Sequence, residues 1–217
     1  GRQYHLNLGN WGLLAVIDLT FLVLVVVGFA LVFVLWRLAS RRRELPCPSW
    51  LAWMVELDNP FTKVNRAKFS VEHLALTPGM KVLDAGCGPG RLTLPLAEAV
   101  GPEGEVTALD LQAGMLDRVR EQVTLAGLSN VRYLHAGLGE GKLQDLRYDR
   151  ITLVTVLGEI PDQNAALKEL HRALRPEGLL SITEVILDPH FQSYKSLLRL
   201  ATETGFEEVS FFGRRLA

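Results

Sequence analysis

A glycine-rich turn at residues 86–90 is the part of the sequence best suited to bind a ligand. It reads GCGPG and follows the apolar run VLDA at 82–85, which is expected to be a buried strand. Glycine permits positive φ angles and a close approach of the backbone, so a ligand can lie against such a turn. The N–H groups of the helix that follows would point toward the anionic end of that ligand. The turn therefore predicts a binding site at the carboxyl end of a strand.

A second acidic residue, Asp110, ends the next apolar run, TALD, about 20 residues beyond the turn. A carboxylate in this position can accept hydrogen bonds from ribose hydroxyls. Nicotinamide-binding proteins use a related turn, but their G-x-G-x-x-G spacing requires glycine at position 91, where this chain has Arg91. A nicotinamide oxidoreductase is therefore the least favoured of the alternatives.

The elements that must position these residues alternate in type from Met80 onward. Short apolar runs are followed by helical patterns, a rhythm that predicts βαβ units and a mostly parallel sheet. Strands are expected at residues 81–85, 105–109, 131–135, 150–154, 179–185 and 207–211. Helices are expected at residues 91–100, 113–126, 164–174 and 194–204. Glycines at 101, 127 and 205 are suited to end three of these helices, and Asp162 is suited to begin the fourth.

These motifs resemble those of the class I S-adenosylmethionine-dependent methyltransferases, over the sequence from about residue 59 to its end. DAGCGPG at 84–90 is similar to the first motif of that family, and TALD at 107–110 is similar to the second. The segments at 148–162 and 173–184 resemble its fourth and fifth strands. The resemblance implies a Rossmann-like, doubly wound α/β domain with S-adenosylmethionine as its cofactor. Within the family, the sequence is most similar to quinone-ring C-methyltransferases and to small-molecule or lipid methyltransferases.

The resemblance also implies which residues contact the cofactor: Asp84, Gly86, Cys87, Gly88, Gly90, Asp110, Leu111, Gly137, Leu138 and Val154. Asp110 would hold the ribose and Leu111 would flank the adenine. Family members often carry an acidic residue after the third strand, where it meets the adenine amino group, but this chain has Gly137 there. The backbone or a neighbouring side chain such as Glu140 is the expected substitute.

Methyl transfer from a sulfonium is an in-line displacement, so catalysis depends chiefly on placing the acceptor atom and excluding water. Some acceptors also need a base. Glu159 and His190 are the candidate catalytic residues, because they follow the fourth and fifth predicted strands at the edge where α/β ligands bind. The alternatives are a solvated Glu159 near a helix start and a His190 that only caps its loop. No metal site is evident.

The segment from residue 13 to 36 reads LLAVIDLTFLVLVVVGFALVFVLW. As a helix it would be roughly 36 Å long, more than the ~30 Å of a bilayer's hydrocarbon core. The sequence therefore predicts one transmembrane helix that binds the lipid bilayer. Arg37 and the run Arg41, Arg42 and Arg43 follow it, so the positive-inside rule places its carboxyl end in the cytoplasm and its N-terminus outside.

Four parts follow from this interpretation: an extramembrane segment at 1–12, the transmembrane helix at 13–36, a basic linker with an amphipathic helix at 37–58, and the methyltransferase-like domain at 59–217. Residues 213–217 resemble only the beginning of a last strand, so we expect that strand to be incomplete. The expected location is the inner (cytoplasmic) membrane of a cell, with the domain on the cytoplasmic side.

Two classes of function are compatible with this organisation. The first is a membrane-anchored methyltransferase that acts on a small, apolar or lipid-like acceptor, since a shared surface raises the effective concentration of both. The second is a non-catalytic subunit of a membrane protein complex, whose helix packs through Asp18 or Gly28. The formal net charge of -1 gives no bias toward nucleic acid, which is not an expected partner.

Overall fold

The computed structural model describes residues 20–28, 31–32, 34–35, 67–186, 188 and 190–213. The chain divides into two compact units, residues 1–43 and 44–217. The described residues of the first unit are helical, and large apolar side chains such as Phe21 and Leu24 are exposed there. The rest of the predicted span at 13–36, and all of 1–12 and 37–58, lie outside the described residues. Within the described ranges, no helix has both the length and the apolar character that crossing a membrane requires.

The second unit is built on a sheet of five parallel strands in the order β3-β2-β1-β4-β5. The strands are β1 (Lys81–Ala85), β2 (Glu105–Asp110), β3 (Val131–His135), β4 (Tyr148–Val154) and β5 (Leu174–Thr183). The strand order reverses between β1 and β4, and ligands of open α/β sheets bind at the carboxyl ends of the strands beside such a switch point. The predicted α/β, Rossmann-like parallel sheet is confirmed.

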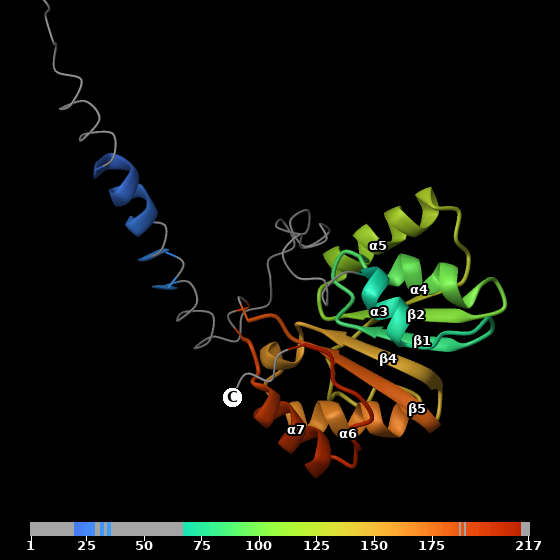
Figure 1. Cartoon of the computed structure of the whole chain (residues 1–217). Coiled ribbons are helices and arrows are strands. Elements are labelled where there is room, and N and C mark those ends of the chain that lie inside the picture. The colour runs from blue at the N-terminus through green and yellow to red at the C-terminus, as the bar shows by residue number, and fades with distance from the viewer. Residues whose placement is uncertain are drawn as a thin grey trace, which may run out of the picture. The chain divides into compact units, whose positions relative to one another are not determined.

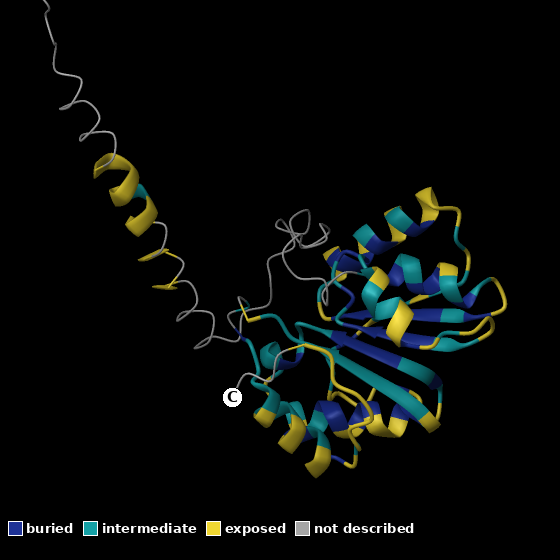
Figure 2. Ribbon diagram, in the orientation of Figure 1, coloured by how far each residue is buried: buried dark blue, intermediate teal, exposed yellow. Residues whose placement is uncertain are grey.

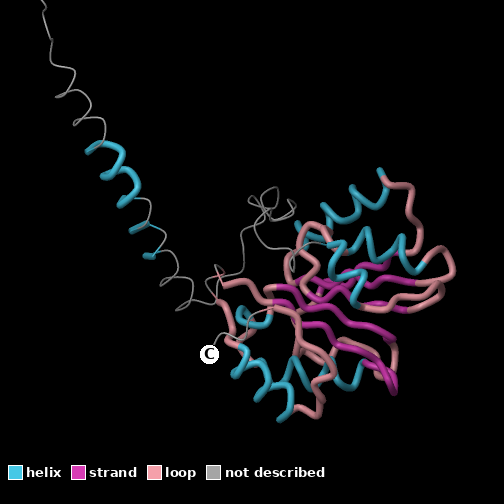
Figure 3. Tube along the Cα trace, viewed as in Figure 1, coloured by secondary structure: helices cyan, strands magenta, loops and turns pink. Residues whose placement is uncertain are grey.

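Helices cover both faces of this sheet (Figures 1 and 3). One layer contains α3 (Ala67–His73), α4 (Thr93–Val100) and α5 (Ala113–Leu125), and the other contains α6 (Gln163–Ala173) and α7 (Tyr194–Glu203). Because side chains alternate along a strand, neighbouring residues of β1 serve the two layers. Val82 packs with Leu96 of α4, whereas Leu83 packs with Leu167 of α6. The central strands are therefore buried on both faces (Figure 2).

The predicted helix ends are confirmed. Gly101, Gly127 and Gly205 follow α4, α5 and α7 with φ angles of 67°, 68° and 97°, a backbone region that glycine enters without strain. Asp162 caps α6 by accepting a hydrogen bond from the N–H of Ala165 at 2.9 Å.

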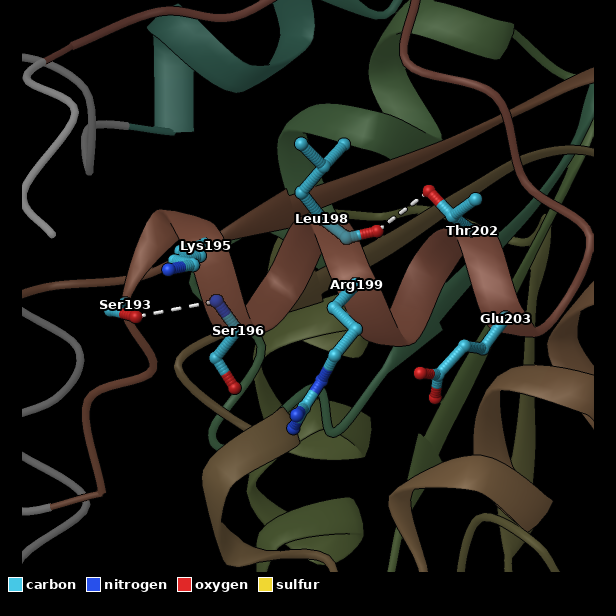
Figure 4. Close-up of a pocket in the computed structure, with 7 residues that line it drawn as sticks. All are labelled: Ser193, Lys195, Ser196, Leu198, Arg199, Thr202 and Glu203. Atoms are coloured by element: carbon cyan, nitrogen blue, oxygen red, sulfur yellow. Dashed lines mark hydrogen bonds between the residues drawn. The ribbon is translucent and has the colours of Figure 1, made fainter.

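Helix α7 begins at a serine cap that the sequence analysis did not single out. The Ser193 hydroxyl oxygen accepts a hydrogen bond from the N–H of Ser196 at 3.3 Å (Figure 4). The hollow drawn in Figure 4 runs along α7 and is lined by this cap and by residues such as Lys195 and Glu203. None of the predicted cofactor or catalytic residues lines it, so it is a separate surface feature.

The start of β5 differs from the prediction, which placed it at residue 179. The strand begins at Leu174, opposite Tyr148, and its register then shifts so that Leu179 lies opposite Arg150. Glu177 has a φ of 64° within this irregularity. The Pro-Glu-Gly sequence at 176–178 therefore forms a bulge within the strand.

The predicted strand at 207–211 is wrong, because none of its residues is assigned to a strand. Its side chains instead contact helices: Glu208 accepts a hydrogen bond from the Tyr194 hydroxyl at 2.7 Å, and the ring of Phe211 packs edge-on against Tyr194. Val209 is 74% exposed. Within the described residues, β5 is therefore one edge strand of the sheet, and β3 is the other. Of the predicted beginning of a further strand at 213–217, residues 214–217 lie outside the described residues.

Candidate cofactor and acceptor site

The glycine turn joins β1 to α4 at the switch point of the sheet. Gly86, Gly88 and Gly90 have φ angles of 71°, 53° and 97°, in the region that other residues enter only with strain. The N–H groups of Gly86 and Cys87 both donate to the Leu109 carbonyl of β2, at 2.8 and 2.9 Å. These bonds fix the turn against the neighbouring strand.

Two of these glycines have different surroundings. A Cβ atom on Gly86 would lie 2.4 Å from Cγ2 of Val156, so the turn packs directly against the segment that follows β4. A Cβ atom on Gly88 would have no other atom within 4 Å. The backbone at Gly88 therefore faces open space, where a ligand can approach it closely.

Asp110 lies beside the turn at the end of β2 and is only 8% exposed. Its carboxylate accepts hydrogen bonds from the N–H groups of Gly88 and Gln112, at 2.9 and 2.8 Å. Burial raises the pKa of this carboxyl above its ordinary value, against the effect of these bonds. A carboxylate offers about four acceptor positions, so Asp110 can hold the turn and still accept bonds from ligand hydroxyls.

Asp84 is buried beneath the turn, with 3% of its surface exposed. Its two oxygens accept hydrogen bonds from the hydroxyls of Thr93 at 2.6 Å and Thr152 at 3.1 Å. Burial raises the pKa of Asp84 to about 6. In this structure Asp84 therefore connects β1, α4 and β4 and supports the turn from within the domain.

The other predicted cofactor residues are placed around the same edge. Leu111 is 58% exposed although it is apolar and directly follows Asp110. Leu138 and Val154 are half-buried and pack against the two main cores. Cys87 is buried, which raises the pKa of its thiol well above the usual value, so it is a packing residue and a poor nucleophile.

The structure brings the two predicted catalytic residues together. Glu159 ends the 3₁₀ turn Leu157–Glu159 after β4, and His190 lies in the loop after β5. The distance from Nδ1 of His190 to Oε1 of Glu159 is 3.8 Å. Gly158 permits this approach, because a Cβ atom there would lie 1.9 Å from the carbonyl oxygen of His190.

The electrostatic surroundings of Glu159 favour its protonated form. Burial, followed by the charges of Asp188, Asp110 and Glu184, raises the pKa of Glu159 to about 8. Burial likewise raises the pKa of Glu184 to about 7, although Glu184 accepts a hydrogen bond from the N–H of Gln192 at 3.3 Å. Carboxyl groups with a pKa near the working pH are suited to exchange protons with a ligand.

Several residues of the site were missed by the sequence analysis. Thr93 and Thr152 bind Asp84, and Asp188 accepts a hydrogen bond from the N–H of His190 at 2.7 Å. Thr155, directly after β4, has a φ of 54°, which is strained for a β-branched residue and is typical of functional sites. Only Thr93 and Thr152 were recognisable from the local sequence, because each is a hydroxyl residue in an otherwise apolar segment.

Residues 82–178 of this chain match the family model described as "Methyltransferase domain". Several curated relatives are named demethylmenaquinone methyltransferase. The chain is 34% identical to that of Listeria monocytogenes over 130 residues, which is 60% of this chain and 54% of the relative. It is 36% identical to that of Staphylococcus aureus over 114 residues, 52% of this chain and 46% of the relative. The chain therefore spans about half the length of these relatives.

Solved structures show the same fold. An S-adenosylmethionine-dependent methyltransferase from Aquifex aeolicus has a TM-score of 0.65 and 24% identity, and the match covers 74% of this chain and 89% of that one. The [4+2]-cyclase SpnF has a TM-score of 0.60 and 21% identity, with 66% of this chain and 57% of that one covered. Because one of these proteins is named for a different reaction, the fold does not by itself identify the activity.

Proposed function

We propose that the chain contains a class I S-adenosylmethionine-dependent methyltransferase domain and that this domain transfers a methyl group to a small, hydroxylated aromatic acceptor of the quinol type. The observation that carries the proposal is the turn at 86–90. It is open above Gly88, and the N–H of Gly88 is bound by the buried carboxylate of Asp110. The residues present therefore fit a nucleoside ligand: backbone that a ligand can touch, and a carboxylate that can accept from ribose hydroxyls.

The cofactor, when bound, supplies an electrophilic methyl group on a sulfonium. The chain's own contribution is to bind and orient the ligands, as in-line displacement requires. We assign Gly86, Gly88 and Gly90 to the backbone contacts of the cofactor and Asp110 to its ribose. Asp84 acts as a positioning residue, since its carboxyl is bound by two threonine hydroxyls beneath the turn.

The acceptor would lie next to Glu159 and His190, on the β4 and β5 side of the switch point. An aromatic ring attacks an electrophile more readily when its hydroxyl group is deprotonated, so ring methylation benefits from a base. Glu159, with a pKa near 8, is suited to accept that hydroxyl proton, and Nδ1 of His190 lies 3.8 Å from its carboxyl oxygen, where the ring can help to position the acceptor. The names of the curated relatives support a demethylated menaquinone as the acceptor class.

The acceptor assay tests this proposal. The full chain in detergent is incubated with S-adenosylmethionine and a demethylated menaquinone, in parallel with the ring reduced and oxidised. We expect the reduced acceptor alone to gain the mass of one CH₂ unit, because the hydroquinone ring is the nucleophile. If the protein binds the cofactor but transfers no methyl group to either form, the proposed quinol acceptor is wrong. Failure to bind the cofactor at all would favour the non-catalytic subunit of a membrane complex.

We further propose that residues 13–36 anchor the domain in the inner membrane, with the N-terminus outside and the domain in the cytoplasm. The support is the apolar composition of that segment, in which Asp18 is the one ionisable residue, and the arginines at 37 and 41–43 that follow it. An apolar, membrane-dissolved acceptor would then share a surface with the enzyme, which raises their effective concentration.

Cysteine labelling in intact cells checks this orientation. The variant Asn7→Cys adds a thiol on the expected outer side, while the native Cys47 lies on the expected cytoplasmic side. A membrane-impermeant maleimide should label position 7 in intact cells and should reach Cys47 only after lysis. Labelling of Cys47 in intact cells would contradict the proposed topology.

A further inference from the structure

Glu184 directly follows β5, at the same edge of the sheet as the proposed acceptor site. Thr183, the last residue of β5, pairs with Val154 of β4, and its carbonyl accepts a hydrogen bond from the N–H of Thr155 at 2.8 Å. Glu184 therefore leaves the sheet at the level where the segment that leads to Glu159 leaves it. Besides burial, the charge of Glu184 is one of those that raise the pKa of Glu159, so the two carboxyl groups lie within electrostatic reach of each other.

The two oxygens of the Glu184 carboxyl group have different surroundings. Oε2 accepts a hydrogen bond from the N–H of Gln192 at 3.3 Å. Oε1 is buried and has no hydrogen-bond partner among the described residues. Buried polar atoms without a partner are costly and uncommon in proteins, so this oxygen calls for a donor. A hydroxyl group of a bound ligand would supply one.

The Glu184 side chain is held in place, yet its carboxyl group can adjust to a ligand. Gln192, which donates to it, is itself fixed, because its side-chain oxygen accepts a hydrogen bond from the Ser196 hydroxyl of α7 at 3.2 Å. The terminal torsion of a glutamate is broad, so the carboxyl oxygens can turn toward a bound hydroxyl. Glu184 also lines a groove whose walls include Ile182 of β5 and Leu197 of α7. The carboxyl group thus borders both the acceptor site and apolar surface, a combination suited to an aromatic ring with polar substituents.

A quinol carries two hydroxyl groups on opposite sides of its ring. In the proposed function, Glu159 accepts the proton of the hydroxyl beside the carbon that is methylated. The far hydroxyl then needs an acceptor of its own, because a polar group left unpaired at a buried site reduces affinity. An ionised carboxylate only accepts hydrogen bonds, so it is suited to a hydroxyl and unsuited to an ether oxygen or to the carbonyl of an oxidised ring.

We propose that Glu184 binds the far hydroxyl of the acceptor and makes the site selective for diols over acceptors with a single hydroxyl. This assignment rests on the proposed function. Glu159 and Glu184 then have separate tasks: the first takes the proton whose loss activates the ring, and the second holds the ring in the orientation that in-line transfer requires.

Steady-state kinetics of the full chain with two matched acceptors, measured without oxygen, test the assignment. The first acceptor is a naphthohydroquinone with a free ring position next to one hydroxyl. The second is its monomethyl ether on the far oxygen, which keeps the hydroxyl beside the reacting carbon. The native kcat/KM for the diol should exceed that for the ether by about 10-fold or more, as expected for a lost bond to a charged group. Both acceptors keep the hydroxyl that Glu159 serves, so a change in the pKa of Glu159 alters both rates alike and cancels in this ratio.

Glu184→Gln should bring the ratio of the two kcat/KM values close to one. An amide can accept the Gln192 bond through its oxygen and turn its NH₂ group toward either a hydroxyl or an ether oxygen, so it does not discriminate. Glu184→Ala should lose the preference as well. Glu207→Ala, which removes an exposed glutamate that lines the same groove, is the matched control and should keep the native ratio. All three variants should bind S-adenosylhomocysteine as the native protein does, and calorimetry checks this.

A native ratio in Glu184→Gln would overturn the assignment, and so would a native protein that uses both acceptors equally. In both cases the proposed function would stand. If the native protein methylated neither acceptor, the proposed function itself would fail, and the assignment with it. If Glu184→Ala lost cofactor affinity through damage to its loop, Glu184→Gln, which keeps the bond to Gln192, would decide.

Discussion

The variant Asp110→Asn should bind S-adenosylhomocysteine about 100-fold more weakly than the native protein, or worse. The carboxylate of Asp110 is the proposed acceptor for the ribose hydroxyls, and a hydrogen bond to a charged group contributes about 1.5–3 kcal/mol. An amide keeps only one acceptor oxygen, whereas both oxygens of Asp110 already accept bonds, from Gly88 and Gln112. The loss therefore combines weaker ribose binding with a looser turn. Titration calorimetry with the full chain measures it.

Asp117→Asn is the matched control for this variant. Asp117 carries the same carboxyl group, but it lies on the exposed face of α5, where it pairs with Arg120. Surface pairs of this kind contribute little, so the control should bind as the native protein does. If Asp110→Asn and the native protein bind S-adenosylhomocysteine with equal affinity, Asp110 does not bind the cofactor.

The variant Glu159→Gln should reduce kcat by roughly 10²–10⁴-fold at pH 8, the usual contribution of a positioned base. In the native protein the carboxyl must be deprotonated before it can accept a proton, and its pKa is raised to about 8. The native kcat should therefore rise with pH and level off above about pH 8, while the residual activity of the variant should lack this step. Steady-state rates across pH 6–9.5 on a reduced quinol acceptor provide the measurement.

Stability supplies a second readout for Glu159 that does not depend on turnover. The folded-state pKa of about 8 lies above the ordinary value of 4.5, so the folded protein favours the protonated form. This contribution to stability is fully present below about pH 4.5 and is lost as the pH rises through about 8. The thermal midpoint of the native protein should therefore fall more between pH 6 and pH 9 than that of Glu159→Gln. Glu184, whose pKa is raised to about 7, contributes to the fall of the thermal midpoint with pH in both proteins.

Glu98→Gln, an exposed glutamate on α4, is the control for both measurements and should change neither. Should Glu159→Gln retain native kcat at pH 8 while still flattening the stability curve, Glu159 would be a buried acid without a catalytic role. Loss of activity together with cofactor affinity would instead indicate damage to the turn, which packs against Val156 nearby.

The sequence was sufficient to predict the elements that depend on local pattern. The bounds of β1 and β3 agree with the expected ranges, and β2 extends one residue further, to Asp110. These strands are short apolar runs between clear breaks, and the helices end at glycines whose positive φ angles the structure confirms. The turn at 86–90 was predictable for the same reason, because three glycines within five residues indicate a backbone with positive φ angles.

The errors concern features that depend on distant partners. The expected strand at 207–211 has a suitable composition, but a strand forms only where a neighbour completes its hydrogen bonds. Here the aromatic side chains pack on helices: Phe211 on Tyr194, and Phe212 on Phe69 and His73. The local sequence does not show whether these residues will pair with a strand or pack on helices.

The pairing of Glu159 with His190 was equally beyond the reach of local pattern. Both residues were singled out separately, but their approach depends on the backbone of Gly158 lying against the loop after β5. The raised pKa of Glu159 arises from burial and from acids far away in the sequence, among them Asp110. Glu140 shows the same limit, because its place beside Gly137 follows from a loop that the distant Glu169 holds.

The central claim is that the turn at 86–90 and Asp110 together bind the nucleoside cofactor, and a crystal structure of the full chain with S-adenosylhomocysteine tests it most directly. The account predicts electron density against the open backbone of Gly88, with the ribose hydroxyls within hydrogen-bonding distance of the Asp110 carboxylate. A nucleoside bound elsewhere, or density over the turn with the Asp110 carboxylate making no contact to the sugar, would contradict it.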